Sequence, residues 1–128
     1  MFTLDQINEI HDQFGKQATL LHYLQALKAI GVHKYDSFIT DGHSEYYGKG
    51  NYKVASSPVH EKLIVAKTSN REELLRHLSL HNEGKTNYLE MSTGLADSGV
   101  EKWTFDTTEM TITYFDLDGQ NMLAEAIG

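Results

Sequence analysis

Apolar side chains in the amino-terminal part of the chain recur at helical spacing. A capping box and a hydrophobic staple predict a helix from Leu4 to about Phe14. The box pairs Thr3 with Gln6, and the staple pairs Phe2 with Ile7. We predict a second helix after Gly15, because apolar residues again recur three or four positions apart until Gly31, a residue suited to closing a helix. These apolar positions are Leu20, Leu21, Leu24, Leu27 and Ile30.

After the second helix the pattern changes from helical to alternating. Residues 35–40 and 44–47 flank the pair Asp41-Gly42, which favours a tight turn, so we predict a β-hairpin. The short apolar run 63–65 is typical of a buried strand, and we predict one further strand there.

Two more helices are predicted in the second half of the chain. Each begins with a polar residue followed three positions later by Glu, the spacing of a capping box. The pairs are Ser69 with Glu72 or Asn70 with Glu73 for the first helix, and Asn87 with Glu90 for the second. Gly99 is placed to close the second of these helices, as Gly31 is in the first half.

Strand patterns follow Gly99 as they follow Gly31. Residues 101–105 and 111–115 are rich in Thr and aromatic side chains, which favour strands. The pair Asp118-Gly119 then predicts a turn before 121–127. The composition of 121–127 favours a helix, whereas its place after a hairpin turn favours a strand, and we choose the strand.

The two halves also match residue by residue at a constant separation of 68 positions, counted from Gly31 to Gly99. The matched residues are Gly31, Val32, Lys34, Tyr35, Tyr46 and Tyr47 in the first half, and Gly99, Val100, Lys102, Trp103, Tyr114 and Phe115 in the second. We therefore predict one domain over 1–128 that contains a duplicated unit, about 3–54 and 70–127.

The duplicated unit predicts an α+β fold. Each copy should consist of two helices followed by a β-meander, and together the copies should form a mostly antiparallel sheet with helices on one face. A pseudo-twofold axis should relate the copies. Tyr35 and Trp103 should then occupy equivalent places on their strands, and we expect both rings to be buried.

The composition agrees with one small globular domain: of 128 residues, 40% are hydrophobic and 23% are charged. No apolar run approaches the roughly 20 residues that cross a bilayer, and the amino terminus has no signal-peptide pattern. We therefore expect a soluble, cytoplasmic protein. The chain has no cysteine, so only His, Asp and Glu side chains could hold a metal.

The formal net charge is −7, and acidic residues crowd the carboxy-terminal part of the chain. From residue 101 onward, Asp and Glu side chains stand against Lys102 alone. Such a surface repels phosphate groups. We therefore expect no binding to nucleic acid or to an anionic membrane surface.

Two histidines form a candidate metal site. His77 and His81 are four residues apart in a predicted helix, so both side chains could ligate one divalent ion. Glu83 at the helix end could supply a third ligand, as could His11 if the duplication brings it close. The alternative is that both histidines border the buried face of their helix, and in that case we expect no cofactor.

Aromatic residues on the predicted strands form a candidate binding surface. They are Tyr35, Tyr46, Tyr47, Trp103, Tyr114 and Phe115. Neighbouring strand residues point to opposite faces, so one ring of each adjacent pair should lie in the core and the other on the open face. Exposed rings of this kind favour a small-molecule ligand, a protein partner or a homodimer interface.

His43 and Glu45 lie two residues apart on one predicted strand and therefore share a face. An acid–base pair would use this arrangement. An exposed polar pair would use it equally, and we favour that interpretation.

Several runs of residues carry a resemblance to a known family. They include Gly31-Val32, the run from Asp41 to Tyr47, the run from Gly99 to Trp103, and the run from Met110 to Asp116. With these, the chain resembles a bacterial family of about 130 residues known as a domain of unknown function, some members of which are labelled "phage envelope protein". The resemblance covers most of the chain and implies an association with phages or mobile elements, without a catalytic residue to carry over.

We therefore expect a small non-catalytic module that binds a ligand or a protein through its aromatic surface or the cleft between the two repeats. The alternative is a metal-dependent enzyme that uses His77 and His81. A third hypothesis, an accessory protein of a phage or mobile element, follows from the resemblance alone.

Overall fold

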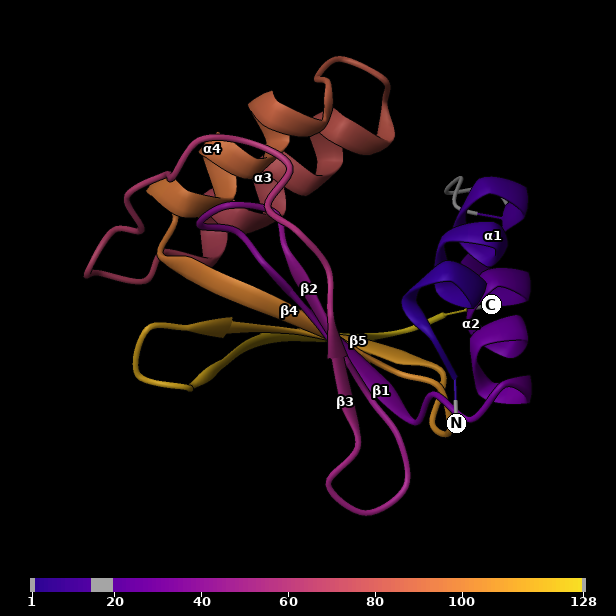
Figure 1. The fold of residues 1–128 in the computed structure, drawn as a ribbon. Helices are drawn as coiled ribbons and strands as arrows, with labels where there is room; N and C mark the ends of the chain where they lie inside the picture. The colour runs from indigo at the N-terminus through magenta and orange to yellow at the C-terminus, as the bar shows by residue number, and fades with distance from the viewer. Residues whose placement is uncertain (1, 15–19, 128) are drawn as a thin grey trace.

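The computed structural model describes residues 2–14 and 20–127 and shows an α+β fold. Over these residues, two helices followed by three strands occur twice in the same order (Figure 1). The elements are α1 (Leu4–Phe14), α2 (Leu20–Ala29), β1 (Lys34–Phe38), β2 (Ser44–Tyr47), β3 (Lys53–Ala55), α3 (Arg71–Asn82), α4 (Tyr88–Asp97), β4 (Val100–Asp106), β5 (Thr111–Asp116) and β6 (Asn121–Ala126). The predicted start of the second helix, after Gly15, lies outside the described residues.

Capping side chains fix the starts of α1, α3 and α4. The backbone N–H of Thr3 donates to Gln6 Oε1 over 2.9 Å, and the N–H of Gln6 donates to Thr3 Oγ1 over 3.2 Å, which confirms the capping box before α1. Asn87 and Glu90 form the same reciprocal pair before α4, and Asn70 caps α3. Within the described ranges, no helix has both the length and the apolar character needed to cross a membrane.

The strands form one antiparallel sheet in the order β3-β2-β1-β4-β5-β6. The predicted Asp41-Gly42 turn connects β1 to β2, and Gly42 has a φ of +79°. The predicted strand at 121–127 is confirmed, because Asn121–Ala126 pairs with β5. The two meanders meet in the middle of the sheet, where β1 pairs with β4.

The strand predicted at 63–65 is wrong, because these residues belong to a loop. The N–H of Leu63 donates a hydrogen bond to the carbonyl of Thr40 in the β1–β2 turn. No ladder of strand-to-strand hydrogen bonds continues from it in the described part of this loop. Leu63 and Val65 pack against the core, whereas Ile64 is 90% exposed, so the apolar run anchors the loop. The additional strand of the sheet is β3, which the sequence pattern did not predict.

Both helix pairs cover the same face of the sheet, as predicted. Tyr35 lies opposite Tyr46 and Phe105 and packs with α1 and α2. Tyr114 lies opposite Trp103 and packs with α3 and α4. In Figure 1 the two helix pairs stand apart, one toward each end of the strands. Trp103, on the strand between them, contacts both groups of core residues.

The two halves have the same order of elements, and their common origin stays a prediction. Asp36 and Thr104, which are 68 positions apart like the matched residues of the repeat, lie opposite each other in the central β1–β4 pair. The burial of two matched rings differs, however. Tyr35 is 6% exposed, whereas Trp103, which we expected to be buried, is only half-buried because it borders a cleft.

Candidate functional site

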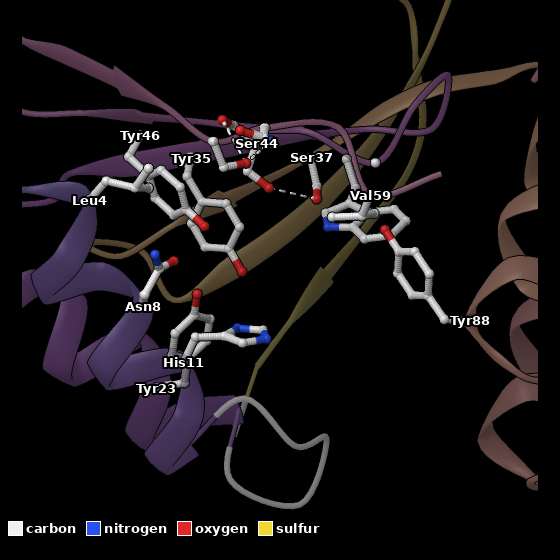
Figure 2. A pocket seen from close by; sticks show the side chains of 14 residues that line it. Leu4, Asn8, His11, Tyr23, Tyr35, Ser37, Ser44, Tyr46, Val59 and Tyr88 are labelled. Atoms are coloured by element: carbon white, nitrogen blue, oxygen red, sulfur yellow. Dashed lines mark hydrogen bonds between the residues drawn. The ribbon is translucent and has the colours of Figure 1, made fainter. Parts of the chain in front are cut away.

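A cleft of about 630 Å³ opens on the covered face of the sheet, between the two helix pairs. Figure 2 shows side chains from α1 and α2 on one side of it and Tyr88 on the other. The lining residues are Leu4, Asn8, His11, Tyr23, Tyr35, Ser37, Gly42, Ser44, Tyr46, Ser56, Ser57, Val59, Tyr88 and Trp103. Both halves of the chain therefore contribute to one cavity.

Strands β1, β2 and β4 form the floor of the cleft. Ser37 and Ser44 lie opposite each other, with hydroxyl oxygens 3.2 Å apart, and Trp103 lies opposite Ser37 on the other side. The N–H of Ser44 donates to Ser56 Oγ over 2.8 Å, which ties the segment after β3 to the floor. The cleft has depth because two serines occupy the central positions of a face that elsewhere carries large apolar side chains.

Three tyrosines form one end of the cleft. The Tyr35 ring stacks between Tyr46 and Phe105, with centroid distances of 5.0 and 4.8 Å, and Tyr23 from α2 meets Tyr35 edge-on at 6.1 Å. Figure 2 shows the hydroxyl groups of Tyr23, Tyr35 and Tyr46 pointing toward one another. Burial raises the pKa of each of these phenols above its usual range, so all three remain neutral hydrogen-bonding groups. His11 lies edge-on to Tyr23, with centroids 5.6 Å apart.

The other end is formed by Tyr88 at the start of α4 and by the loop after β3. The carbonyl of Asp41 accepts hydrogen bonds from the N–H groups of Val59 and His60, over 2.9 and 3.2 Å. Val59 packs directly on Gly42, where a Cβ would lie 2.3 Å from Val59 Cγ2. The loop is therefore held against the β1–β2 turn and forms a fixed wall of the cleft.

The lining residues that the structure describes include no Asp, Glu, Lys or Arg. Their polar groups are hydroxyls, one amide, the imidazole of His11 and the indole N–H of Trp103. Around this uncharged lining, the chain as a whole has a formal net charge of −7. The cleft is therefore chemically distinct from the rest of the protein.

The structure separates the six aromatic residues of the predicted binding surface. Tyr35, Tyr46 and Trp103 line the cleft, and Tyr114 is buried beneath α3 and α4. The remaining two, Tyr47 and Phe115, are half-buried on the opposite face, as the alternation of strand residues predicts.

Several cleft residues carried no functional signal in the sequence. Tyr23 fits the apolar spacing of its helix and reads as core, whereas Tyr88 follows the capping residue of another helix. Ser37 and Ser44 are small polar residues at inward strand positions. That placement is the one available signal, because a buried serine on a core face leaves space above the sheet.

His77 and His81, both on α3, make contacts with α4 and with the loop that joins the two helices. A Cβ at Gly94 would lie 2.3 Å from His77 Nδ1, so the imidazole of His77 packs directly on the α4 backbone. His81 Nδ1 lies 3.1 Å from the carbonyl oxygen of Thr86, in the loop between the two helices. The histidines thus connect the two helices of the pair.

The proposed third metal ligands lie apart from these histidines. His11 borders the cleft beside Tyr23, and Glu83 has Lys85 Nζ 3.8 Å from its Oε1. Across residues 2–14 and 20–127, no three His, Asp or Glu side chains come together in a group that could hold a metal ion.

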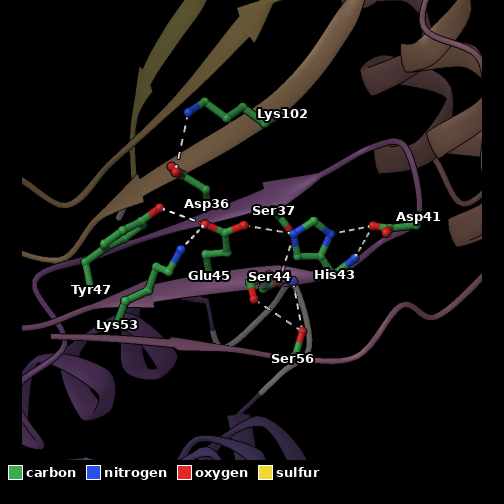
Figure 3. Close-up of polar contacts among 10 residues, drawn as sticks. All are labelled: Asp36, Ser37, Asp41, His43, Ser44, Glu45, Tyr47, Lys53, Ser56 and Lys102. Carbon is green, nitrogen blue, oxygen red and sulfur yellow. Dashed lines mark hydrogen bonds and ion pairs between the residues drawn. The ribbon is translucent and has the colours of Figure 1, made fainter.

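A polar network occupies the sheet face opposite the cleft (Figure 3). His43 lies between two carboxylates, with Nδ1 2.5 Å from Asp41 Oδ1 and Nε2 3.0 Å from Glu45 Oε2. Its ring stacks on Phe38, with centroids 4.5 Å apart and planes inclined by 2°. Tyr47 also donates to Glu45, over 3.0 Å. Both ring nitrogens of His43 are engaged, so the arrangement fits a structural ion cluster better than a catalytic base.

The network shifts the pKa values of His43, Asp41 and Glu45 toward their charged forms. Burial by itself would lower the pKa of His43, but its hydrogen bonds with Asp41 and Glu45 outweigh this effect and raise it. The hydrogen bond with His43 lowers the pKa of Glu45. For Asp41, burial acts in the opposite direction and the hydrogen bonds from His43 prevail, so its pKa is lowered as well.

Comparison with known proteins gives a family for the chain. Residues 8–126 match the family described as "Protein of unknown function (DUF1398)". No curated protein matches the chain. Because the match spans nearly all of the described elements, the chain belongs to the family of proteins of unknown function DUF1398.

Proposed function

We propose that the protein is a binding module that takes up a small molecule in the cleft between its two helix pairs. The observation that carries this proposal is a cavity of about 630 Å³ on the face of the sheet that the helix pairs cover. The cavity lies between the two pairs, in space that helix side chains would otherwise fill. Ligand sites in proteins commonly have volumes of about 300–1,000 Å³ and combine an aromatic lining with a few convergent polar groups.

The positions of the polar groups support binding. Tyr35, Tyr46, Ser37 and Ser44 project from paired strands, which hold side chains more rigidly than loops do. Tyr23 completes the group from a helix that packs on the same core. A ligand would therefore meet hydrogen-bonding groups that are already in place.

The chemistry of the lining favours binding over catalysis. Phenols whose pKa is raised are poor bases at neutral pH, because the phenolate form is rarely populated. His11 carries the one imidazole among the described lining side chains. An association with phages or mobile elements stays a prediction from the resemblance, and the genes that neighbour this one would test it.

Amide correlation spectra by NMR, recorded with a set of neutral, cationic and anionic fragment molecules, test the proposal. We expect at least one fragment to shift the signals of cleft residues in a saturable manner. If no fragment shifts them, or if every saturable shift maps to the opposite face of the sheet, the proposal is wrong.

A matched pair of variants links such shifts to the cleft. Ser57→Trp places a bulky ring at the exposed rim of the cleft and should abolish the shifts, whereas Ser79→Trp places the same ring at an exposed position on α3 and should leave them unchanged. Equal responses in both variants would contradict binding in the cleft.

A further inference from the structure

Five hydroxyl groups in the cleft share one property, which narrows the class of ligand. Each hydroxyl of Tyr23, Tyr35, Tyr46, Ser37 and Ser44 can rotate and can both donate and accept a hydrogen bond. A ligand group with the same dual capacity, such as an alcohol, can pair with any of them. A ligand that only donates or only accepts leaves part of their capacity unused, which is costly in a buried site.

Charged ligands fit this cleft poorly. The described lining offers no carboxylate, ammonium or guanidinium group, and its one imidazole, His11, lies beside Tyr23, so a charge on the ligand elsewhere in the cleft would be desolvated without an opposite charge. The raised pKa values of Tyr23 and Tyr35 agree with this point for negative charge, because burial disfavours the ionised phenolate. The ligand should therefore be neutral.

The end of the cleft away from the three tyrosines offers apolar ring surface. Trp103 on the floor is half-buried and therefore has accessible ring area, and Tyr88 on the wall is 41% exposed. Val59 lies on the same wall. The aromatic rings can cover a nonpolar face of a ligand whose edge carries hydroxyl groups toward Tyr35 and Tyr46.

A ring with nonpolar faces, hydroxyl groups around its edge and no charge is a neutral sugar. We infer that the cleft binds a neutral carbohydrate of one or two rings, with its hydroxyl groups toward the tyrosines and serines and a ring face toward Trp103 and Tyr88. This inference rests on the proposed function above, since it names the ligand class of the same cleft.

The test compares neutral sugars with a charged analogue of the same shape. The probes are glucose, galactose, mannose, maltose and cellobiose, with glucuronate as the charged counterpart of glucose, each titrated while amide spectra are recorded. We expect at least one neutral sugar to shift cleft signals, and glucuronate to bind about tenfold or more weakly than glucose because its carboxylate has no partner.

Hydroxyl deletions on one strand provide the matched control. Tyr46→Phe removes a hydroxyl from the cleft and should weaken sugar binding by about three- to tenfold. Tyr47→Phe removes a hydroxyl from the opposite face of the same strand and should leave the affinity unchanged. Equal effects of the two substitutions would overturn the inference.

The outcomes separate this inference from the proposed function. If neutral aromatic or amide fragments bind in the cleft while none of the five sugars does, the carbohydrate inference is wrong and the binding function stands. Glucuronate binding as tightly as glucose would also overturn it. If neither fragments nor sugars shift cleft signals, the proposed function and the inference are both wrong.

Discussion

Thr104 Oγ1 donates a hydrogen bond of 2.6 Å to Asp36 Oδ1 where β1 and β4 join the two halves of the sheet. Asp36 is only 4% exposed, although it lies on the face opposite the helix pairs. Its other oxygen, Oδ2, has Lys102 Nζ 3.4 Å away. The central strand pair therefore carries a buried carboxylate whose donors come from the partner strand.

Thr104→Val should lower the free energy of unfolding by about 1 to 3 kcal/mol, because it keeps the shape of the side chain but removes a donor from a buried carboxylate. Thr113→Val is the matched control. Thr113 faces Thr104 from β5, and its side chain makes no hydrogen bond in the part of the chain that the structure describes. Urea unfolding of both variants checks the prediction, which an equal loss in the two would contradict.

The ion cluster around His43 should give stability a pH optimum. The raised pKa of His43 means that its contribution is complete below its unfolded value, about pH 6.5, and is lost as the pH rises through the folded-state pKa. The lowered pKa values of Asp41 and Glu45 mean that their contribution is complete above about pH 4.5 and is lost as the pH falls through their folded-state values.

The stability difference between the wild-type protein and His43→Gln should therefore be largest between about pH 4.5 and 6.5, and should shrink on both sides. Urea unfolding of both proteins across a pH series measures this difference and cancels the titration of the remaining histidines. A difference that stayed constant from acid to alkaline pH would show that the cluster does not stabilise the fold in this way.

Gly94→Ala should destabilise the protein, although the substitution raises helix propensity. The propensity gain is about 0.5 to 1 kcal/mol. The new Cβ would lie 2.3 Å from His77 Nδ1, and relieving such a contact typically costs about 1 to 3 kcal/mol. Combining it with His77→Ala should remove the contact and make Gly94→Ala stabilising. Thermal unfolding of the single and double variants decides the matter, and an unchanged sign in the His77→Ala background would refute the explanation.

Tyr35→Ala should destabilise the protein more than Trp103→Ala. Tyr35 is 6% exposed between two stacked rings, so its removal leaves a cavity. We expect the free energy of unfolding to fall by about 3 to 5 kcal/mol. Trp103 is half-buried at the cleft, and part of its ring area faces solvent in the folded state. Tyr35→Phe, which keeps the ring, should recover most of the stability. Equal unfolding midpoints for the two alanine variants would contradict this ranking.

Local signals explain which elements could be predicted from the sequence. A capping box such as Thr3 with Gln6 acts within one helical turn, and the Asp41-Gly42 turn needs a few residues to form. The strand at 53–55 has too few residues to show a pattern, and its pairing with β2 is what makes it a strand. The apolar run 63–65 was misread because loop anchoring and strand burial leave the same short signature.

The cleft could be predicted only in part, because it depends on tertiary arrangement. The alternation of strand residues was enough to identify Tyr35, Tyr46 and Trp103 as members of a candidate binding surface. Tyr23 and Tyr88 lie on helices of different pairs, and no local pattern shows that their side chains border one space. The metal hypothesis has the same limit, because the spacing of two histidines within one helix does not show whether a third ligand lies near them.

β1 and β4 pair with each other, so each strand covers an edge of the other half of the sheet. Without this pairing, both edges would be exposed. A chain that ended after β3 would carry β1 as a free edge, and such an edge pairs readily with a second copy. If two of these half-proteins paired in the register that β1 uses with β4, Asp36 would face a second Asp36 at the centre of the dimer. Like charges directly opposite each other destabilise a strand pair. Placing threonine rather than aspartate at position 104 therefore favours the union of unlike halves over the self-association of the first half.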